Sequence, residues 1–549
     1  MGASSSSHQV SQEEKEAETL AMATGCLPML QKAFTKLSNP QTNTIPIKTL
    51  RECFYIQSTK LESEESAIPE SFPKLLENLG ASVIDQFFKT ENEEISSFEF
   101  LRGFVRCCGR NPASVSLNML CKLYSKTCAK VDMLPKPEIL FDDSIDGKVS
   151  GSLTTADMHM LLWMCWIMAH SPWILRFCDE QNGKAALVLP EINHLVFSVM
   201  VSCSEIGSDM DILGKDVSVC TDQISIGKFH LWALATVPGL ANCLGRYVHD
   251  RLQRLSSIHE ESNKCEQDVS EPSSRSVGDL SSANTRNRHL LTCGRAWAIS
   301  LSLRDFSIEE LLKICCFPER GVGTCQQLLY RSCLDGKGMN RFWAKVEGYH
   351  GPLLMLISAS SGSQSHHGVG QWIIGVLIYQ GFENKDVYYG SNGCLYAISP
   401  IFRVFAPSGK EKNFVYSHLR PTRKVYEAHP KPVGIAFGGS IGNERVVLDE
   451  DFSRITVRHH ALDKTYKPGS LIANQGFLPV EASILEVEVW GLGGEVAREV
   501  QDSYKQREQL FAEQRRKVDL KNFTSWEDLP EKIMMDMISD PNRVRREDR

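Results

Sequence analysis

Apolar residues recur at helical spacing over much of residues 20–255, and this pattern predicts a mostly helical N-terminal part. A representative stretch is Leu76, Leu79, Val83 and Phe87. A polar break at Thr90–Glu94 precedes a second apolar stretch near Phe100, which predicts a helix–loop–helix pair with Ile95 in the loop. The uninterrupted apolar run Met160–Ala169 is shorter than the roughly 20 residues that a membrane-spanning helix needs. We therefore expect this run to be buried within the protein.

A similar helix–loop–helix pattern occurs around Ile45, Val149 and Ile224, where a β-branched residue precedes the start of a helical pattern. These segments resemble EF-hand units, in which the residue at loop position 8 pairs with the neighbouring loop. Calcium binding by such a loop requires several oxygen ligands, a Gly at position 6 and a bidentate Glu at position 12. None of the loops is complete.

The first half of the loop around Val149 comes closest to a calcium-binding sequence, because Asp142 and Asp146 occupy ligand positions 1 and 5. Its closing position holds Leu153, which has no ligand atom. The sequence therefore predicts a degenerate EF-hand-like domain with a structural role. A weak calcium site at Asp142–Gly147 is the alternative, and calcium is the only cofactor considered.

A linker and a β-rich part follow. Residues 256–288 are rich in Ser, Asn and charged residues, which predicts disorder. Leu290–Cys316 has a helical pattern, and short apolar runs separated by Gly, Pro, Asn and Ser then predict strands. These runs are Phe342–Glu347, Leu353–Ser358, Trp372–Tyr379, Leu395–Ser399, Asn413–Ser417, Val433–Phe437, Arg445–Leu448 and Ile484–Trp490. Many strands joined by close turns favour an antiparallel β-sandwich.

The pattern becomes helical again from Glu495 to about Leu520, with Val496, Val500 and Tyr504 four residues apart and Phe511 further on. The predicted class is thus α+β and multidomain. The predicted parts are a disordered N-terminus at 1–19, an all-α EF-hand-like domain at 20–255, the linker at 256–288, a β-sandwich with a leading helix at 289–494, a C-terminal helix at 495–520 and a tail at 521–549.

Composition narrows the function classes. The 549 residues carry a formal net charge of −7, so we expect no nucleic-acid partner, because nucleic-acid binders usually show a strongly basic face. The 18 cysteines are scattered at apolar positions, and the first twenty residues have no apolar signal-peptide core. Reduced thiols in a cytoplasmic protein are the prediction.

Several usual traces of catalysis are missing from the sequence, which has no P-loop, HExxH or helix-opening GxGxxG motif. His366-His367 and His459-His460 are adjacent pairs, and neighbours in a strand point to opposite faces. We therefore expect no catalytic residue, no metal at these pairs and no small-molecule substrate.

The chain begins Met1-Gly2-Ala3-Ser4-Ser5-Ser6, which matches the N-myristoylation pattern with Gly2 as the acylated residue. A Ser-rich disordered tail is the alternative. A single acyl chain gives only marginal, reversible membrane attachment, so a partner at the membrane would have to supply the rest.

The segment from about Ser307 to Gly494 resembles the TLDc domain family through a series of phrases in the family's order. The phrases are Leu329–Ser332, Asp335-Gly336, Gly351–Leu354, Gly375, Tyr389–Ser391, Leu395–Pro400, Phe402–Val404, Asn413–Tyr416, Gly434–Gly439, Leu448–Phe452 and Glu488–Gly491. The resemblance implies a two-sheet β-sandwich flanked by short helices. It also implies Gly438, Gly439 and Gly491 in turns with positive φ, Trp490 as a buried anchor and Asp449 as a further signature residue.

Members of this family bind the proton-pumping V-ATPase, and some promote its disassembly. They are also linked to protection against oxidative damage, and no enzymatic reaction is established for the domain. After the paired glycines the family usually carries Glu, where this sequence has Ser440. An activity that needs that carboxylate is in doubt here, whereas a binding role is less affected.

The order of N-terminal Gly, EF-hand-like domain, linker, TLDc domain and C-terminal helix resembles a subgroup that acts at vacuolar or lysosomal membranes. This subgroup is linked to the V-ATPase and to growth signalling through mTOR. In it the helix after the domain takes part in partner binding, which implies such a role for Val496, Val500, Tyr504 and Phe511. A helix that packs on its own sandwich is the alternative.

The sequence leaves three candidate functions for this protein. The first is a non-enzymatic regulator that is cytoplasmic, peripheral at the lysosomal or vacuolar membrane and bound to peripheral V-ATPase subunits. The second is a calcium-responsive module. The third is a thiol-dependent antioxidant enzyme that would use Cys325, Cys333 or Cys394 and would need a thiolate of low pKa.

Overall fold

The fold is taken from a computed structural model. The residues it describes are 12–56, 60–63, 67–88, 93–132, 138–141, 149–180, 186–203, 223–257, 289–303, 311, 327–362, 370–420, 430–459, 463–525 and 538. The predicted linker lies outside the described residues from position 258 onward. So do most of the predicted tail and residues 304–310 and 312–316 of the predicted helix Leu290–Cys316.

The N-terminal part is helical, as predicted. Its α-helices are α1 (Gln12–Ala23), α2 (Leu27–Leu37), α3 (Ile47–Phe54), α4 (Ser71–Val83), α5 (Ser97–Cys108), α6 (Ala113–Lys130), α7 (Thr155–Ala169), α8 (Ser171–Glu180), α9 (Asn193–Cys203), α11 (Ile226–Thr236) and α12 (Cys243–Ser257). The described residues of this part also include a π-helical turn, η1 (Ile84–Phe88), and a 3-10 turn, η2 (Pro238–Asn242). Because α1 begins at Gln12, the prediction of disorder was wrong for positions 12–19.

Short strands tie the loops between these helices together. β1 (Ile45–Pro46) and β3 (Glu94–Ile95) are antiparallel with Ile45 opposite Ile95, which confirms the predicted pairing of these two loops. A second group joins β4 (Glu138–Phe141), β5 (Val149–Thr154) and β7 (Gln223–Ser225), and β2 (Leu61–Ser63) pairs with β6 (Leu187–Leu189).

In the second group the predicted register was wrong by four residues. Ile224 lies opposite Leu153, whereas Val149 lies opposite Phe141. The cap of the next helix explains the shift. Thr154 accepts a hydrogen bond from the backbone of Asp157, and the Asp157 carboxylate accepts one from the backbone of Thr154 in return. This capping box fixes where α7 starts.

Helix α7 occupies the centre of the helical part, and all of Met160–Ala169 is buried as predicted. Its apolar residues face every direction rather than one stripe, as expected for a helix surrounded by other helices. Across the described residues, no helix has the length and apolar composition to cross a membrane.

The C-terminal part is built on an antiparallel sheet, which has 11 strands among the described residues. The strands are β8 (Leu328–Arg331), β9 (Leu353–Ser360), β10 (Gln371–Ile378), β11 (Lys385–Tyr389), β12 (Gly393–Ser399), β13 (Arg403–Phe405), β14 (Val415–His418), β15 (Gly434–Ser440), β16 (Asn443–Leu448), β17 (Arg454–Val457) and β18 (Val480–Gly491). Their order is β11-β14-β15-β16-β17-β18-β9-β10-β12-β13, with β8 also paired to β18.

The sheet curls around one core, because Ile357 of β9, Val376 of β10 and Phe437 of β15 belong to the same buried cluster. One continuous sheet therefore replaces the two separate sheets that were predicted. The predicted strand Phe342–Glu347 was also wrong, since this segment lies in α17 (Met339–Val346), next to the short α16 (Ser332–Asp335).

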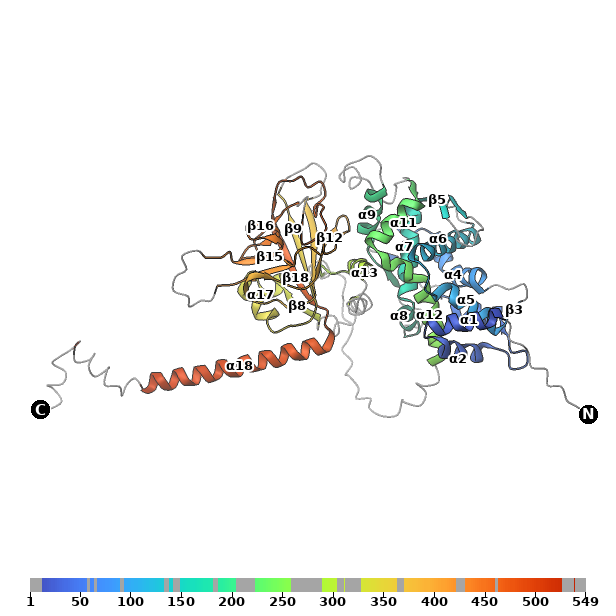
Figure 1. Cartoon of the computed structure of the whole chain (residues 1–549), viewed down its shortest axis with the longest axis horizontal. Helices are drawn as coiled ribbons and strands as arrows, with labels where there is room; N and C mark the ends of the chain where they lie inside the picture. Colours follow the sequence, from blue (N-terminus) through green and yellow to red (C-terminus); the bar gives the residue numbers. More distant parts are fainter. Residues whose placement is uncertain are drawn as a thin grey trace, which may run out of the picture.

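Two helices frame the sheet. In Figure 1, α13 (Cys293–Ser302) lies between the sheet and the N-terminal helices, and α18 (Gly494–Ser525) extends away from the sheet toward the C-terminus. Helix α18 covers the helix predicted at 495–520 and continues into the predicted tail.

Candidate functional site

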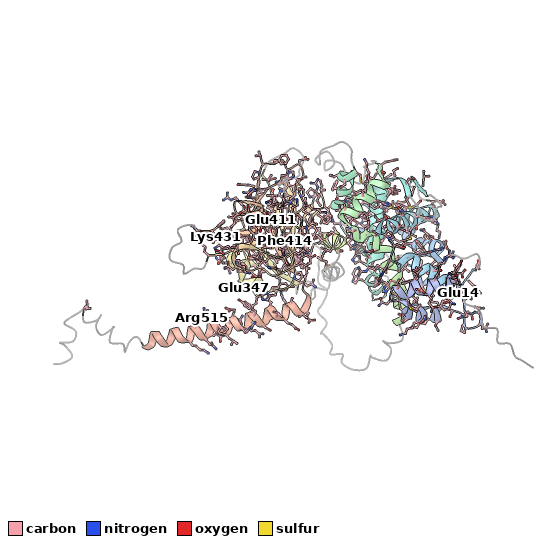
Figure 2. All side chains as sticks on the ribbon, viewed as in Figure 1. Glu14, Glu347, Glu411, Phe414, Lys431 and Arg515 are labelled. Atoms are coloured by element: carbon pink, nitrogen blue, oxygen red, sulfur yellow. The ribbon has the colours of Figure 1, made fainter. Side chains whose placement is uncertain are left out.

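The first turns of α18 are fixed to the sheet part by hydrogen bonds. The buried amide of Gln501 donates to the carbonyl oxygens of Lys345 at 2.9 Å and Glu347 at 3.1 Å. The ammonium group of Lys505 donates to the same Lys345 carbonyl at 3.0 Å. These carbonyls close α17, and Glu347 lies above the inner part of α18 in Figure 2. Buried polar groups with partners of this kind hold an element in one orientation.

Glycines let α18 approach closely. A Cβ at Gly351 would lie 3.0 Å from the Cβ of Ala497, and one at Gly348 would lie 2.4 Å from the ring of Tyr504. Gly348 also has a φ of +80°, which L side chains rarely adopt. The hydroxyl of Tyr349 accepts a hydrogen bond from the Gly493 backbone at 2.7 Å and fixes the turn into the helix.

The structure splits the four predicted partner-binding residues between two environments. Tyr504 packs over Gly348 and donates to the Glu347 carboxylate at 3.2 Å, so it belongs to the anchored face. The other three are exposed, with 73% of Val496, 45% of Val500 and 56% of Phe511 accessible to solvent. Partner binding by these residues remains a prediction.

Beyond Lys505 the helix leaves the body of the protein. The side-chain hydrogen bond of Arg507 goes to Ser503 within the same helix, and Arg515 lies far out along α18 in Figure 2. Leu510 and Phe511 are exposed on this projecting part. The result is a helix with a rigid base and an outer half that offers both apolar and charged side chains.

The signature residues of the sheet have mainly structural surroundings. Gly438 and Gly439 have φ values of +68° and +77°, as predicted. The same prediction was wrong for Gly491, which lies in β18 without a positive φ. A side chain is excluded there for another reason, because a Cβ would lie 2.7 Å from the hydroxyl of Tyr349.

Trp490 is buried, which confirms its prediction as an anchor, and its indole N–H donates to Glu488 at 2.9 Å. Asp449 closes the turn between β16 and β17 by accepting hydrogen bonds from the backbone of Ser453 and Arg454. Ser440, where the family usually has Glu, is exposed at the end of β15. These residues hold the sheet together and do not converge on a reaction centre.

Glu488 fixes the chain where it enters α13. Its fully buried carboxylate accepts hydrogen bonds from the indole of Trp490 at 2.9 Å and from the backbone of Leu291 at 3.3 Å. It also lies 3.2 Å from the Arg331 guanidinium and 3.3 Å from a ring nitrogen of His289. A buried carboxylate with this many partners determines how the chain joins the sheet.

The helical part and the sheet share one hydrophobic core, which includes Trp297 of α13 together with Leu356 and Tyr396 of the sheet. Phe402 is the central contact, because its N–H donates to the carbonyl of His194 at 3.1 Å and its carbonyl accepts from the Ser198 hydroxyl at 2.5 Å. The two parts are thus docked onto one another through α9, α13 and the segment after β12.

His194 lies at this contact with its ring 6.0 Å from that of Phe402. Neither ring nitrogen has a hydrogen-bond partner among the described residues. Burial lowers the pKa of His194 from 6.5 to about 4, while Glu191 raises this pKa slightly and Arg295 lowers it slightly. The ring is therefore neutral while the two parts are docked.

Of the three thiols considered for catalysis, Cys333 is exposed, and Cys325 lies outside the described residues. Desolvation and the hydrogen bond to Glu486 raise the pKa of Cys333 to about 11. This disfavours the thiolate that a peroxide-reactive site needs. The vicinal thiols Cys107 and Cys108 have raised pKa values as well, mainly because they are buried.

The calcium candidates Asp142 and Asp146 and the acylation candidate Gly2 lie outside the described residues. Among the residues that the structure does describe, no group of His, Cys, Asp or Glu could hold a metal ion. Ser96 and Glu99 form a capping box at the start of α5, so the Glu99 carboxylate is engaged by the helix end.

Comparison with known protein families identifies the domain that contains the sheet. The sequence model of the TLDc domain matches residues 306–493. This segment is a TLDc domain. It contains the curled sheet with α16 and α17, whereas α13 and α18 lie on either side of it.

One similar protein is Restriction of telomere capping protein 5 from Zygosaccharomyces rouxii, which is 26% identical over 139 residues. The match covers 25% of this chain and 25% of that protein. The chain therefore matches a quarter of the length of this relative.

Sequence reasoning missed several residues that position the TLDc domain and its neighbours. Gln501 is a polar residue that lies next to Val500 in α18 and is buried in the structure. No sequence pattern indicates that this polar position belongs to the face that packs on the domain. The buried ion pair of Arg445 and Asp463 joins residues 18 positions apart, and the contact of Phe402 with Ser198 joins residues 204 positions apart. Neither pairing leaves a local pattern in the sequence.

Proposed function

We propose that this chain is a non-enzymatic regulatory protein that binds peripheral subunits of the V-ATPase through α18 and its TLDc domain. The proposal places it at the cytoplasmic face of the lysosomal or vacuolar membrane, where it modulates assembly or activity of the pump. A myristoyl group on Gly2 would assist this attachment. Links to oxidative-stress resistance and to mTOR signalling belong to the same proposal.

One observation carries the proposal, namely that α18 is fixed at its base and has exposed side chains at the described positions 506–517 beyond it. A helix whose base is rigid and whose outer apolar residues are exposed is preorganised for a partner, because little conformational freedom is lost on binding. The TLDc match supports the choice of partner class. The raised pKa of Cys333 favours this reading over a thiol enzyme.

The test is capture of V-ATPase peripheral subunits by the purified full-length chain. We expect Val500→Ala combined with Phe511→Ala to weaken capture about tenfold, since aromatic and aliphatic anchors at an interface typically contribute over 1 kcal/mol each. Leu231→Ala is the matched control, because Leu231 is an exposed apolar residue of α11. Equal capture by an unrelated β-sandwich protein, or unchanged capture by the double variant, would contradict the proposal.

The helical part suits a structural role better than a calcium-responsive one. We propose that the pairings Ile45–Ile95 and Leu153–Ile224 belong to degenerate EF-hand-like units. The acidic residue that follows in two of these loops, Glu99 or Asp157, is engaged in a capping box.

We therefore expect isothermal titration of the full-length chain with calcium to give no binding heat from about 1 μM to 1 mM. Asp142→Asn combined with Asp146→Asn is the matched variant. A heat that appears with the wild-type chain and disappears with this variant would establish the calcium site and overturn the structural reading.

A further inference from the structure

An exposed apolar tip lies on the TLDc domain in the segment between β17 and β18. Phe477 is 75% exposed and Leu478 is 80% exposed, and they stand side by side in the sequence between Gly476 and Pro479. Single exposed apolar residues are common on protein surfaces, but two adjacent large ones at a loop tip are a costly arrangement without a partner.

Strand directions place a third exposed apolar residue at the same end of the sheet. β15, β16, β17 and β18 are antiparallel neighbours, so the turn after β15 and the segment after β17 emerge at one end. That turn carries Ile441, which is also exposed. This end, called here the loop end, thus presents apolar residues from two separate turns.

The tip stands on a rigid base. The side-chain amide of Gln475 is buried and donates to the Val457 carbonyl at 2.9 Å. The ring of Phe477 stacks on His459 with centroids 4.9 Å apart and an interplanar angle of 7°. Earlier in the segment, the buried guanidinium of Arg445 donates to the Gly469 carbonyl at 2.7 Å. The Phe477 ring and the segment that carries it are therefore held in place before any partner arrives, which lowers the entropy cost of binding.

Basic side chains surround this end. Segments 406–411 and 463–467 pair with one another, and the side chain of Asn413 donates to the Gly439 carbonyl near the end of β15 at 2.8 Å. These contacts bring four exposed lysines to the loop end, namely Lys410, Lys412, Lys464 and Lys467. Arg458 follows β17. Among the described residues, the acidic groups there are Glu411, which pairs with Lys464 at 3.2 Å, Glu444, which pairs with Arg458 at 3.4 Å, Glu481 at the start of β18, and the buried Asp463, which pairs with Arg445. Basic groups therefore exceed acidic ones.

We propose that the loop end binds the surface of an anionic lipid bilayer, with Phe477 and Leu478 inserted among the lipids and the lysines against the headgroups. A small projecting tip fits this occupant better than a protein partner. Stable protein interfaces usually bury about 800 Å² on each side, whereas a few apolar side chains with electrostatic support suffice at a bilayer surface. Lysines near anionic headgroups add to the attachment.

The loop end does not include α18, whose Val500 and Phe511 are the residues changed in the test of V-ATPase binding, so the two proposals can fail separately. It would provide a second membrane attachment next to a single acyl chain, and two attachments together are what stable anchoring requires.

Flotation of the full-length, unacylated chain with vesicles tests the proposal. The vesicles are phosphatidylcholine alone, and phosphatidylcholine with phosphatidylserine at a molar ratio of about 7 to 3. We expect binding to the anionic vesicles only, weakened by added salt. Phe477→Ser with Leu478→Ser is expected to reduce it about tenfold or more, because two exposed apolar side chains lose their insertion. Lys464→Ser with Lys467→Ser is expected to reduce it about tenfold.

Leu334→Ser is the matched control, since Leu334 is exposed in α16, which follows the strand paired to the far end of β18. Absence of wild-type binding, equal binding to neutral vesicles, or undiminished binding by the Phe477 and Leu478 variant would overturn the proposal. A concentration-dependent dimer in lipid-free solution that this variant abolishes would also overturn it, because a second copy of the chain would then be the occupant.

Discussion

Replacing Arg445 with Met is expected to lower the free energy of unfolding of the TLDc domain by about 3–5 kcal/mol, the usual cost of removing one partner of a buried ion pair. Arg445 and Asp463 have no exposed side-chain surface and lie 2.7 Å apart. The guanidinium also donates to the carbonyls of Lys467 and Gly469, each at 2.7 Å, and lies 4.7 Å from the ring centre of Phe405. Methionine keeps the aliphatic packing but leaves Asp463 and both carbonyls without this donor.

Urea unfolding followed by circular dichroism measures the effect. Arg454→Met is the matched control, because that guanidinium is 72% exposed and lies 4.0 Å from Asp449, a geometry that contributes less than about 1 kcal/mol. Adding Asp463→Asn to Arg445→Met should recover part of the loss, since it removes the uncompensated charge. An Arg445→Met transition that coincides with the wild type would refute this role.

The sequence predicted most strands of the TLDc domain because alternating apolar runs and glycine-rich turns are local signals. It misassigned Phe342–Glu347 as a strand because this segment is one of the short apolar runs between turn-forming residues. The helical signal was nevertheless present, since Met339, Phe342, Trp343 and Val346 are spaced three and four apart and all are buried in α17. Strands such as β11 and β13 were missed because they are short or polar.

How the strands join could not be read from the chain. A two-sheet sandwich and one curled sheet have the same alternation of buried and exposed residues, and only the order of pairing separates them. The register at Ile224 was misread for a related reason, because Val149 and Leu153 both precede polar residues. The deciding signal was the capping box of Thr154 and Asp157.

The candidate interaction surface was predictable only in part. Spacing indicated an amphipathic C-terminal helix, but the face that packs on the domain is set by Ala497, Gln501 and Tyr504 rather than by the valines. Packing of this kind depends on Gly348 and Gly351, which are far away in the sequence. An amide can be buried there because two carbonyls at the end of α17 receive it.

The second large effect is expected at the contact between the helical part and the TLDc domain. Replacing the fully buried Phe402 with Ala should cost about 3–5 kcal/mol, as is usual for Phe-to-Ala changes in a core. The backbone of Phe402 is hydrogen-bonded to His194 and Ser198 of the helical part, so its ring lies at the contact between the two parts. Loss of the ring should therefore loosen the docking rather than one domain alone. We expect urea unfolding to separate into two transitions, and small-angle scattering to show a larger radius of gyration.

His194 gives a specific readout of the same variant. Burial holds its pKa near 4, so the folded state binds a proton only well below the ordinary value of 6.5, and docking loses stability as pH falls between these values. Opening the contact hydrates the ring, and the pKa of His194 should rise toward 6.5 in histidine-detected NMR titration. His170, which burial also holds near 4, lies within the helical core and should not move. Phe511→Ala is the matched control on an exposed position of α18, and an unchanged His194 titration in Phe402→Ala would show that the contact does not depend on this ring.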